Sequence, residues 1–155
     1  MLIHTEVAGH FDAPIEQGWQ FLRDIHVLPI WHVSVVQARD IAGTFDQVGS
    51  TATVVLKLPD GLHDFNIRVT EVEPYRLMQH AGQQVDGASR YTTTVHCAPG
   101  GRGTDWTWEQ DYEVPDGSSG PFGSEAFMGR LMEQVLRQSA ENTKLLLEAM
   151  VAQPV

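Results

Sequence analysis

This sequence predicts an α+β fold in which one curved antiparallel sheet surrounds a long C-terminal helix. Three observations support the prediction. Apolar residues alternate with a period of two over residues 31–114, the segments of that stretch are joined by short turns, and helical spacing takes over in residues 121–150. Strands joined by short turns must be antiparallel, because a parallel crossover needs about a dozen residues or more. The predicted order is β-α-α-β6-α, a seven-stranded sheet with an internal cavity.

The first strand is expected at residues 2–11, where apolar and polar residues alternate. Pro14 indicates the start of a helix, since proline is tolerated in the first turn. Gly18 either weakens this helix by about 1 kcal/mol relative to alanine or permits the close approach of a neighbour. A short second helix or turn at residues 26–31 is limited by Pro29, which disfavours helical geometry in the residue before it.

Six further strands complete the predicted sheet. They are expected near residues 32–41, 48–58, 62–73, 75–84, 88–98 and 103–114. Glycine, proline and aspartate in the connections are typical of hairpin turns. In the last strand Trp106, Trp108 and Tyr112 share one face, and acidic residues occupy the other. A sheet with one apolar and one solvated face is covered on one side only.

The final segment, residues 121–150, is expected to be the helix that covers the apolar face. Ser124 can cap its start, and apolar residues recur along it at helical spacing. At about 1.5 Å per residue it would run about 40 Å and cross the whole sheet. A helix held by a curved sheet leaves space where the sheet flares away, so we predict a pocket between them.

Composition indicates one globular domain, residues 1–155, with 42% hydrophobic and 19% charged residues. A formal net charge of −10 opposes binding to nucleic acid or to an anionic membrane surface. No apolar run approaches the roughly 18 residues of a membrane span, and residues 1–10 lack the features of a secretion signal. Cys97 is the only cysteine, so no intrachain disulfide can form. We expect a cytoplasmic monomer or homodimer.

Five stretches resemble segments of one protein family. They are FDAPIEQGWQFLRDIHVLPIW (11–31), VGSTATVVL (48–56), VTEVEPYRLM (69–78), GGRGTDWTWEQDYEVP (100–115) and NTKLLLEAM (142–150). They span nearly the whole chain and keep the order of the family's elements. The family is the START/Bet v 1-like (SRPBCC) superfamily, and specifically its bacterial polyketide cyclase/dehydrase and lipid transport branch.

The resemblance implies a helix-grip fold that binds a hydrophobic or amphipathic small molecule of lipid, polyketide or aromatic type. The ligand would lie in the cavity between the sheet and the C-terminal helix. Some members of the family carry or sense ligands and others are cyclases, aromatases or dehydratases, so carrier and enzyme both stay open. A third hypothesis is a protein-interaction module that uses the charged outer face. No cofactor is expected.

The predicted cavity wall combines aromatic residues of the sheet with apolar residues of the last helix. We predict ligand contacts from Phe65, Ile67, Tyr91, Trp106, Trp108, Tyr112, Phe127, Met128, Leu131, Met132 and Val135. Methionine is flexible and polarisable, so it lines adaptable apolar pockets. The polar tips of tyrosine and tryptophan need a partner when buried, which favours them as ligand-orienting groups. The alternative for each residue is a place in a solid core.

Acid–base chemistry in the cavity would need an inward-facing histidine or tyrosine. The alternation of the strand predicted at residues 62–73 turns His63 inward, so His63, Tyr91 and Tyr112 are the catalytic candidates. Arg68 would join them if its strand twisted inward. The alternation leaves the facing of Arg68 and His80 open. No two histidines have the close spacing of a zinc site, so no metal is predicted.

The remaining histidines divide by position. His4, His10 and His96 fall on outer faces or at strand ends, where solvated histidines are expected. His26 and His32 flank the turn after the first helix, near the expected mouth of the cavity.

Overall fold

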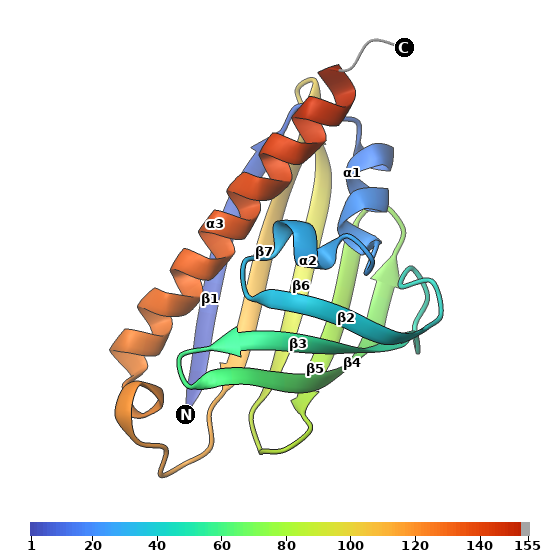
Figure 1. The fold of residues 1–155 in the computed structure, drawn as a ribbon. Helices are drawn as coiled ribbons and strands as arrows, with labels where there is room; N and C mark the ends of the chain where they lie inside the picture. The colour runs from blue at the N-terminus through green and yellow to red at the C-terminus, as the bar shows by residue number, and fades with distance from the viewer. Residues whose placement is uncertain (153–155) are drawn as a thin grey trace.

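The structure is a computed structural model that describes residues 1–152, and it confirms the predicted order of elements (Figure 1). The last three residues of the predicted domain lie outside the described part. The elements are β1 (Leu2–Phe11), α1 (Ile15–Arg23), α2 (Leu28–Trp31), β2 (Val35–Ala42), β3 (Thr51–Leu58), β4 (Gly61–Glu73), β5 (Leu77–Gln84), β6 (Arg90–Gly100), β7 (Gly103–Glu113), the 3-10 turn η1 (Gly120–Gly123) and α3 (Glu125–Ala152).

All seven strands form one antiparallel sheet in the order β1-β7-β6-β5-β4-β3-β2. The sheet bends so strongly that β2 and β3 pass in front of β5–β7 (Figure 1). Register shifts lie between Arg39 and Ala42 in β2 and between Val69 and Glu71 in β4. Such bulges bend a strand and increase its twist, so they account for part of the curvature that creates an interior.

The two faces of the sheet follow the predicted alternation. Along β7 the side chains of Trp106, Trp108 and Tyr112 are buried. On the outer face His4 Nδ1 lies 2.7 Å from an oxygen of Asp111, and both side chains are exposed. The aromatic residues of β7 therefore face the interior.

Helix α3 lies along one edge of the sheet, where it packs chiefly against β1 (Figure 1). Helix α3 does not cover the apolar face alone, because the bend of the sheet and the α1–α2 segment enclose the remainder. The buried stripe of α3 consists of Met128, Met132, Leu136, Ser139, Thr143 and Leu147. Phe127, which we expected to point inward, precedes this stripe and is 37% exposed.

Polar residues in the middle of α3 hold the connection between α2 and β2. Ser139 is fully buried, and its Oγ accepts a hydrogen bond of 3.1 Å from the backbone N–H of Val33. Asn142 Nδ2 donates to the backbone oxygen of Trp31 at 3.2 Å. The polar interruption of the apolar stripe thus satisfies backbone groups at the end of α2.

The two glycines inside helices differ in their surroundings. A Cβ on Gly18 of α1 would lie 2.4 Å from two ring carbons of Phe11, whose side chain is fully buried. A Cβ on Gly129 of α3 would meet nothing within 4 Å. Of the two roles proposed for Gly18, the structure shows the close approach of a neighbour.

Gly18→Ala should therefore lower the free energy of unfolding by about 1 kcal/mol. Overpacking costs about 1–3 kcal/mol, and the better helix propensity of alanine offsets about 1 kcal/mol of that. Gly129→Ala is the matched control and should raise stability by up to about 1 kcal/mol. Urea unfolding of both variants checks this, and a Gly18→Ala protein as stable as the wild type would contradict it.

Candidate functional site

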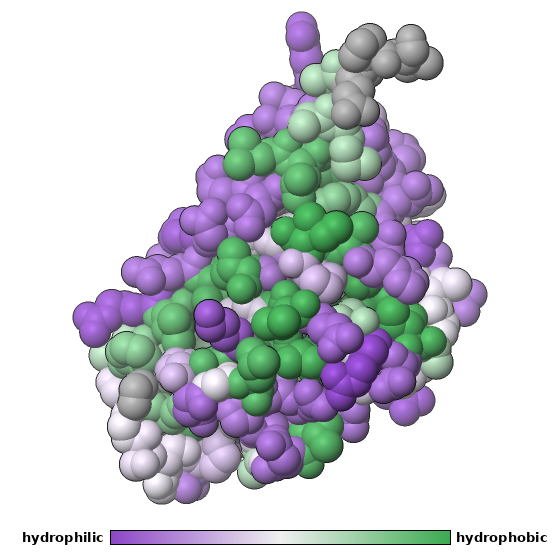
Figure 2. All heavy atoms as spheres, viewed as in Figure 1, coloured by the Kyte–Doolittle hydropathy of each residue, from purple (hydrophilic) through white to green (hydrophobic). Residues whose placement is uncertain are grey.

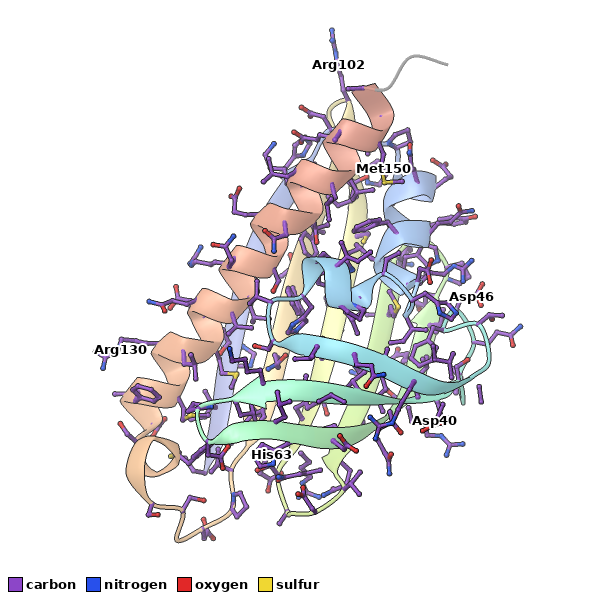
Figure 3. The ribbon with its side chains drawn as sticks, viewed as in Figure 1. Asp40, Asp46, His63, Arg102, Arg130 and Met150 are labelled. Atoms are coloured by element: carbon purple, nitrogen blue, oxygen red, sulfur yellow. The ribbon has the colours of Figure 1, made fainter. Side chains whose placement is uncertain are left out.

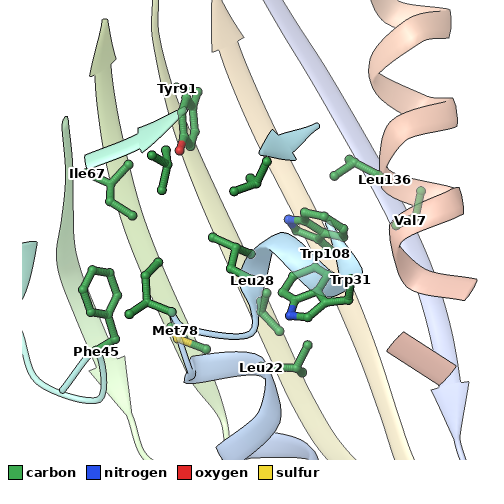
Figure 4. Packing of buried hydrophobic residues seen from close by; sticks show 14 of the residues in the cluster. Val7, Leu22, Leu28, Trp31, Phe45, Ile67, Met78, Tyr91, Trp108 and Leu136 are labelled. Atoms are coloured by element: carbon green, nitrogen blue, oxygen red, sulfur yellow. The ribbon is translucent and has the colours of Figure 1, made fainter. Parts of the chain in front are cut away.

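A cavity of about 80 Å³ lies between the inner face of the sheet, the α1–α2 segment and α3. Its wall is mostly apolar, and the wall residues labelled in Figure 4 include Leu22, Leu28, Trp31, Met78 and Trp108. One water needs roughly 10–15 Å³ of such volume, whereas a cavity that binds benzene measures about 150 Å³. The cavity as it stands is therefore smaller than one aromatic ring requires.

Polar side chains form a row across the inner face of three neighbouring strands. His80 of β5 pairs with Thr93 of β6, which pairs with Gln110 of β7, and all three border the cavity. Thr93 Oγ1 accepts a hydrogen bond of 2.6 Å from Trp108 Nε1, and Gln110 Nε2 lies 3.5 Å from the sulfur of Met132. Within residues 1–152 the His80 side chain has no hydrogen-bond partner.

His32 borders the same cavity from the connection between α2 and β2. Its ring centroid lies 5.4 Å from that of Trp108 in an edge-to-face arrangement. Its Nδ1 is 3.2 Å from the backbone nitrogen of Ser34, which donates to it. In the neutral ring this bond assigns the proton to Nε2, so His32 offers the cavity a donor.

Both imidazoles are neutral at pH 7. Burial lowers the pKa of His32 and of His80 to about 4. The pKa of His32 is lowered further by the positive charge that His80 carries when it is protonated. Each side chain nevertheless keeps an intermediate accessible surface. This combination is expected of a group that lies deep in the protein but borders an internal space.

Both of the predicted tyrosines, Tyr91 and Tyr112, border the cavity. The Tyr91 ring meets His80 edge-on, with centroids 5.9 Å apart, and burial raises the pKa of its hydroxyl. Burial also raises the pKa of Tyr112, and the neighbouring Ser89 only partly opposes that rise. The approach of Ser89 does not complete a hydrogen bond, so the buried Tyr112 hydroxyl has no partner in the described chain.

A second buried donor without a partner among residues 1–152 is Trp31 Nε1–H. Figure 4 shows this nitrogen directed toward the space between Leu22 and Met78, both of which border the cavity. A buried polar group left unsatisfied costs about 1–3 kcal/mol. Both donors are closed off from the cavity as it stands, so a bound molecule could complete their hydrogen bonds only if the wall opened.

Phe45, in the loop between β2 and β3, closes part of the cavity wall. Its side chain is 3% exposed, and its backbone has a φ of 60°, a region that bulky residues rarely adopt. Its N–H donates to Ser50 Oγ at 3.2 Å, and Arg23 of α1 donates to the backbone oxygen of Thr44 at 2.8 Å. These bonds hold an aromatic ring in the wall on a backbone strained by about 1–3 kcal/mol.

The structure brings together part of the predicted ligand set. The residues of that set that border the cavity are Tyr91, Trp108, Tyr112, Met132 and Val135.

The other members of the set lie elsewhere. Phe65, Ile67 and Met128 are buried in the surrounding core, and Trp106 and Leu131 border a separate groove between β1 and α3. The Phe65 ring packs against Tyr91 with centroids 5.6 Å apart and so supports the wall from behind. The inward alternation of Phe65 and Ile67 is confirmed, although neither borders the cavity.

His63 lies outside this cavity, at the end of the sheet that is remote from α1 (Figure 3). Its Nε2 is 2.7 Å from an oxygen of Asp60, and its Nδ1 is 3.0 Å from Gln84 Nε2. It borders a shallower pocket whose wall it shares with Tyr112. Arg68 is exposed, so its strand does not turn it inward.

His80, whose facing was left open, and His32, expected near the mouth of the cavity, are cavity residues that the sequence did not single out as catalytic or ligand-binding candidates. Alternation in β5 was ambiguous because both of its faces mix polar and apolar residues. One signal could have resolved it: Gly82, which shares the face of His80, pairs with Tyr91, and a Cβ there would lie 2.4 Å from the Tyr91 ring. A glycine opposite a large ring in a predicted strand pair indicates the crowded, inward face.

Other classes of site find little support in the described chain. No helix of residues 1–152 is long and apolar enough to cross a membrane. No group of three histidine, cysteine, aspartate or glutamate residues there could hold a metal ion.

Apolar residues do reach the surface where α2 meets α3, in the face shown in Figure 2. Ile30 and Val33, at and just after α2, are exposed.

The buried histidines should make stability depend on pH. Stability should fall as the pH is lowered from about 6.5 to about 4, because in that window the unfolded chain binds protons at His32 and His80 and the folded protein does not. The loss would reach about 3 kcal/mol for each histidine. Urea unfolding across this pH range measures it.

His80→Leu should remove about half of this pH dependence, and His96→Leu, at an exposed position of β6, is the control. His4 and His10 contribute with the opposite sign, because hydrogen bonds to Asp111 and Asp105 raise their pKa. They are present in every variant, so the difference between variants isolates His80. A His80→Leu protein with the wild-type dependence would show that His80 is not the group that titrates.

The chain matches one family model, and several solved structures share its fold. The chain matches the family model described as Polyketide cyclase / dehydrase and lipid transport over residues 3–148. None of the curated proteins matches it.

Several solved structures share its fold. The Zhui aromatase/cyclase from Streptomyces sp. R1128 is 13% identical with a TM-score of 0.75, over 97% of this chain and 96% of that one. A START superfamily protein from Mycobacterium smegmatis is 16% identical with a TM-score of 0.74, over 95% and 98% of the two chains.

The di-domain ARO/CYC StfQ from the steffimycin biosynthetic pathway is 10% identical with a TM-score of 0.76. The match covers 99% of this chain and 53% of StfQ, so this chain spans about half the length of StfQ. At these identities the likeness shows the fold alone. Because the family match covers nearly the whole sequence, the chain belongs to the polyketide cyclase/dehydrase and lipid transport family.

Proposed function

We propose that this protein binds a small hydrophobic or amphipathic molecule, of lipid, polyketide or aromatic type, in the cavity between the sheet and α3. The observation that carries the proposal is an internal cavity with an apolar wall and a few convergent polar groups, which is the usual composition of a ligand site. Membership of a family described by polyketide cyclisation and lipid transport supports the same ligand classes.

The polar groups favour an amphipathic ligand over a pure hydrocarbon. Trp31 Nε1–H and the Tyr112 hydroxyl are buried without partners in the described chain. A ligand oxygen that accepted a hydrogen bond from either group would recover part of the cost of about 1–3 kcal/mol.

Binding requires the cavity to grow, and Phe45 is the wall residue best placed to move. It belongs to a loop rather than to a strand, and its backbone lies in the left-handed region. Its ring occupies about the volume that one ring of a ligand would need. Departure of the Phe45 ring would therefore add the missing space without disturbing the sheet.

Phe45→Leu should bind naphthalene about tenfold more tightly than the wild type, a difference of about 1.4 kcal/mol, because the ligand no longer displaces an aromatic ring. Quenching of tryptophan fluorescence measures the binding, since Trp31 and Trp108 border the cavity.

Tyr75→Leu is the matched control for this experiment. Tyr75 also has a positive φ, of 65°, but its side chain is 44% exposed and lies outside the cavity. The Tyr75→Leu change should leave the affinity for naphthalene unchanged. If neither naphthalene nor a medium-chain fatty acid bound to the wild type or to folded Phe45→Leu, the proposal would be refuted.

Acid–base catalysis on the bound molecule is the second candidate, and the histidine pair in the cavity favours it. His80 is a neutral imidazole without a partner in the described chain, so it could remove a carbon-bound proton while His32 Nε2–H donates to the developing enolate oxygen. In this arrangement His80 takes the role for which His63 was the sequence candidate.

Exchange of the acidic C–H protons of a cyclic 1,3-diketone for deuterium, followed by NMR, tests this candidate. His80→Gln should abolish protein-dependent exchange and retain binding, whereas His63→Gln should retain both. If exchange were no faster with the protein than in buffer alone, the catalytic candidate would be refuted and the binding function would stand.

A further inference from the structure

The two cavity histidines lie in one continuous part of the wall. Trp108 connects them, because its ring meets the His32 ring at 5.4 Å and its Nε1 donates to Thr93 Oγ1 at 2.6 Å. Thr93 is in turn the strand partner of His80. A group bound beside Trp108 can therefore face both imidazoles.

Together the two rings offer a defined set of hydrogen-bonding positions. His32 uses Nδ1 as the acceptor for Ser34 N–H, which leaves only the Nε2–H donor. The neutral His80 ring has one donor and one acceptor, and within residues 1–152 neither is engaged. The two rings thus present at least one donor and one acceptor to the cavity.

A hydroxyl group fits this set, because it donates one hydrogen bond and accepts two. A carbonyl or an ether only accepts, so it would leave the acceptor of His80 unsatisfied. A carboxylate would bring a negative charge to two neutral rings, and burial of an unpaired charge is strongly unfavourable. The pairing of Arg23 with the loop at Thr44 and Asp46 leaves no free cation among the described residues that border the cavity to compensate it.

The rest of the wall favours a flat, aromatic molecule that bears this hydroxyl group. The rings of Trp31, Trp108 and Tyr91 surround the histidines, and Trp31 and Trp108 meet edge-to-face with centroids 5.6 Å apart. Aromatic rings prefer to meet other rings edge-on or offset. With the ring of Phe45 displaced, the space suits one or two fused rings better than a long chain.

We propose that the cavity selects neutral hydroxylated aromatic molecules of the phenol or naphthol type, whose hydroxyl donates to His80 and accepts from His32 Nε2–H. This inference rests on the proposed binding function and narrows its ligand class.

Three near-isosteric probes test the proposal: 2-naphthol, 2-methoxynaphthalene and 2-methylnaphthalene. The first offers a donor and an acceptor, the second an acceptor only, and the third neither. At neutral pH 2-naphthol should bind at least about tenfold more tightly than either of the others, in the wild type and in Phe45→Leu, since one buried hydrogen bond contributes about 1 kcal/mol and the unsatisfied imidazole adds to the difference.

Variants of the two histidines identify the partners. His80→Leu should reduce the affinity for 2-naphthol to that for 2-methoxynaphthalene, because the bond from His32 remains, and leave 2-methylnaphthalene binding unchanged. His32→Leu should weaken 2-naphthol and 2-methoxynaphthalene together. His96→Leu, on the exposed face of β6, should change none of the three affinities.

The outcomes separate the two proposals. Equal binding of all three probes to the wild type and to the histidine variants would overturn hydroxyl selection and leave the binding function intact. Failure of every probe to bind, in Phe45→Leu as well as in the wild type, would overturn both. If His80→Leu did not fold, as judged by circular dichroism, His32→Leu and the comparison of 2-naphthol with 2-methoxynaphthalene on the wild type would decide.

Discussion

The cavity exists because α3 holds the α2–β2 connection over the open side of the sheet. Ser139 and Asn142 bond the backbone of Val33 and Trp31 at this point. Without those bonds the end of α2 would carry unsatisfied backbone groups in a partly buried place, which is costly. The same contacts fix Trp31 and His32 in the wall, so the chemistry of the cavity depends on two polar residues in the middle of α3.

The interior combines polar groups with an environment that keeps them uncharged. His32 and His80 lose their charge through burial, and the hydroxyls of Tyr91 and Tyr112 keep their protons for the same reason. Asp24 borders the cavity, and its carboxylate accepts a hydrogen bond of 3.0 Å from the backbone N–H of His26. A molecule inside the cavity therefore meets directional hydrogen bonds rather than ion pairs, and recognition there depends on the placement of donors and acceptors.

The order of elements and the inward faces of β4 and β7 could be predicted because alternation and turn residues are local properties. The buried stripe of α3 could not be placed to the residue, since Phe127 and Met128 both fit helical spacing and only the packing against β1 decides between them. The facing of His80 depends on the pairing of β5 with β6. The size of the cavity depends on bulges and on Phe45, neither of which leaves a periodic signal.

The tryptophan cluster has an optical consequence. Trp108 lies 5.6 Å from Trp31 and 6.1 Å from Trp106 between ring centroids, whereas Trp19 pairs with Tyr75 instead. Three indoles at such separations share their excitation and act as one coupled chromophore. Near-ultraviolet circular dichroism of this protein will therefore carry an exciton contribution, and a molecule that touches one ring will alter the signal of all three.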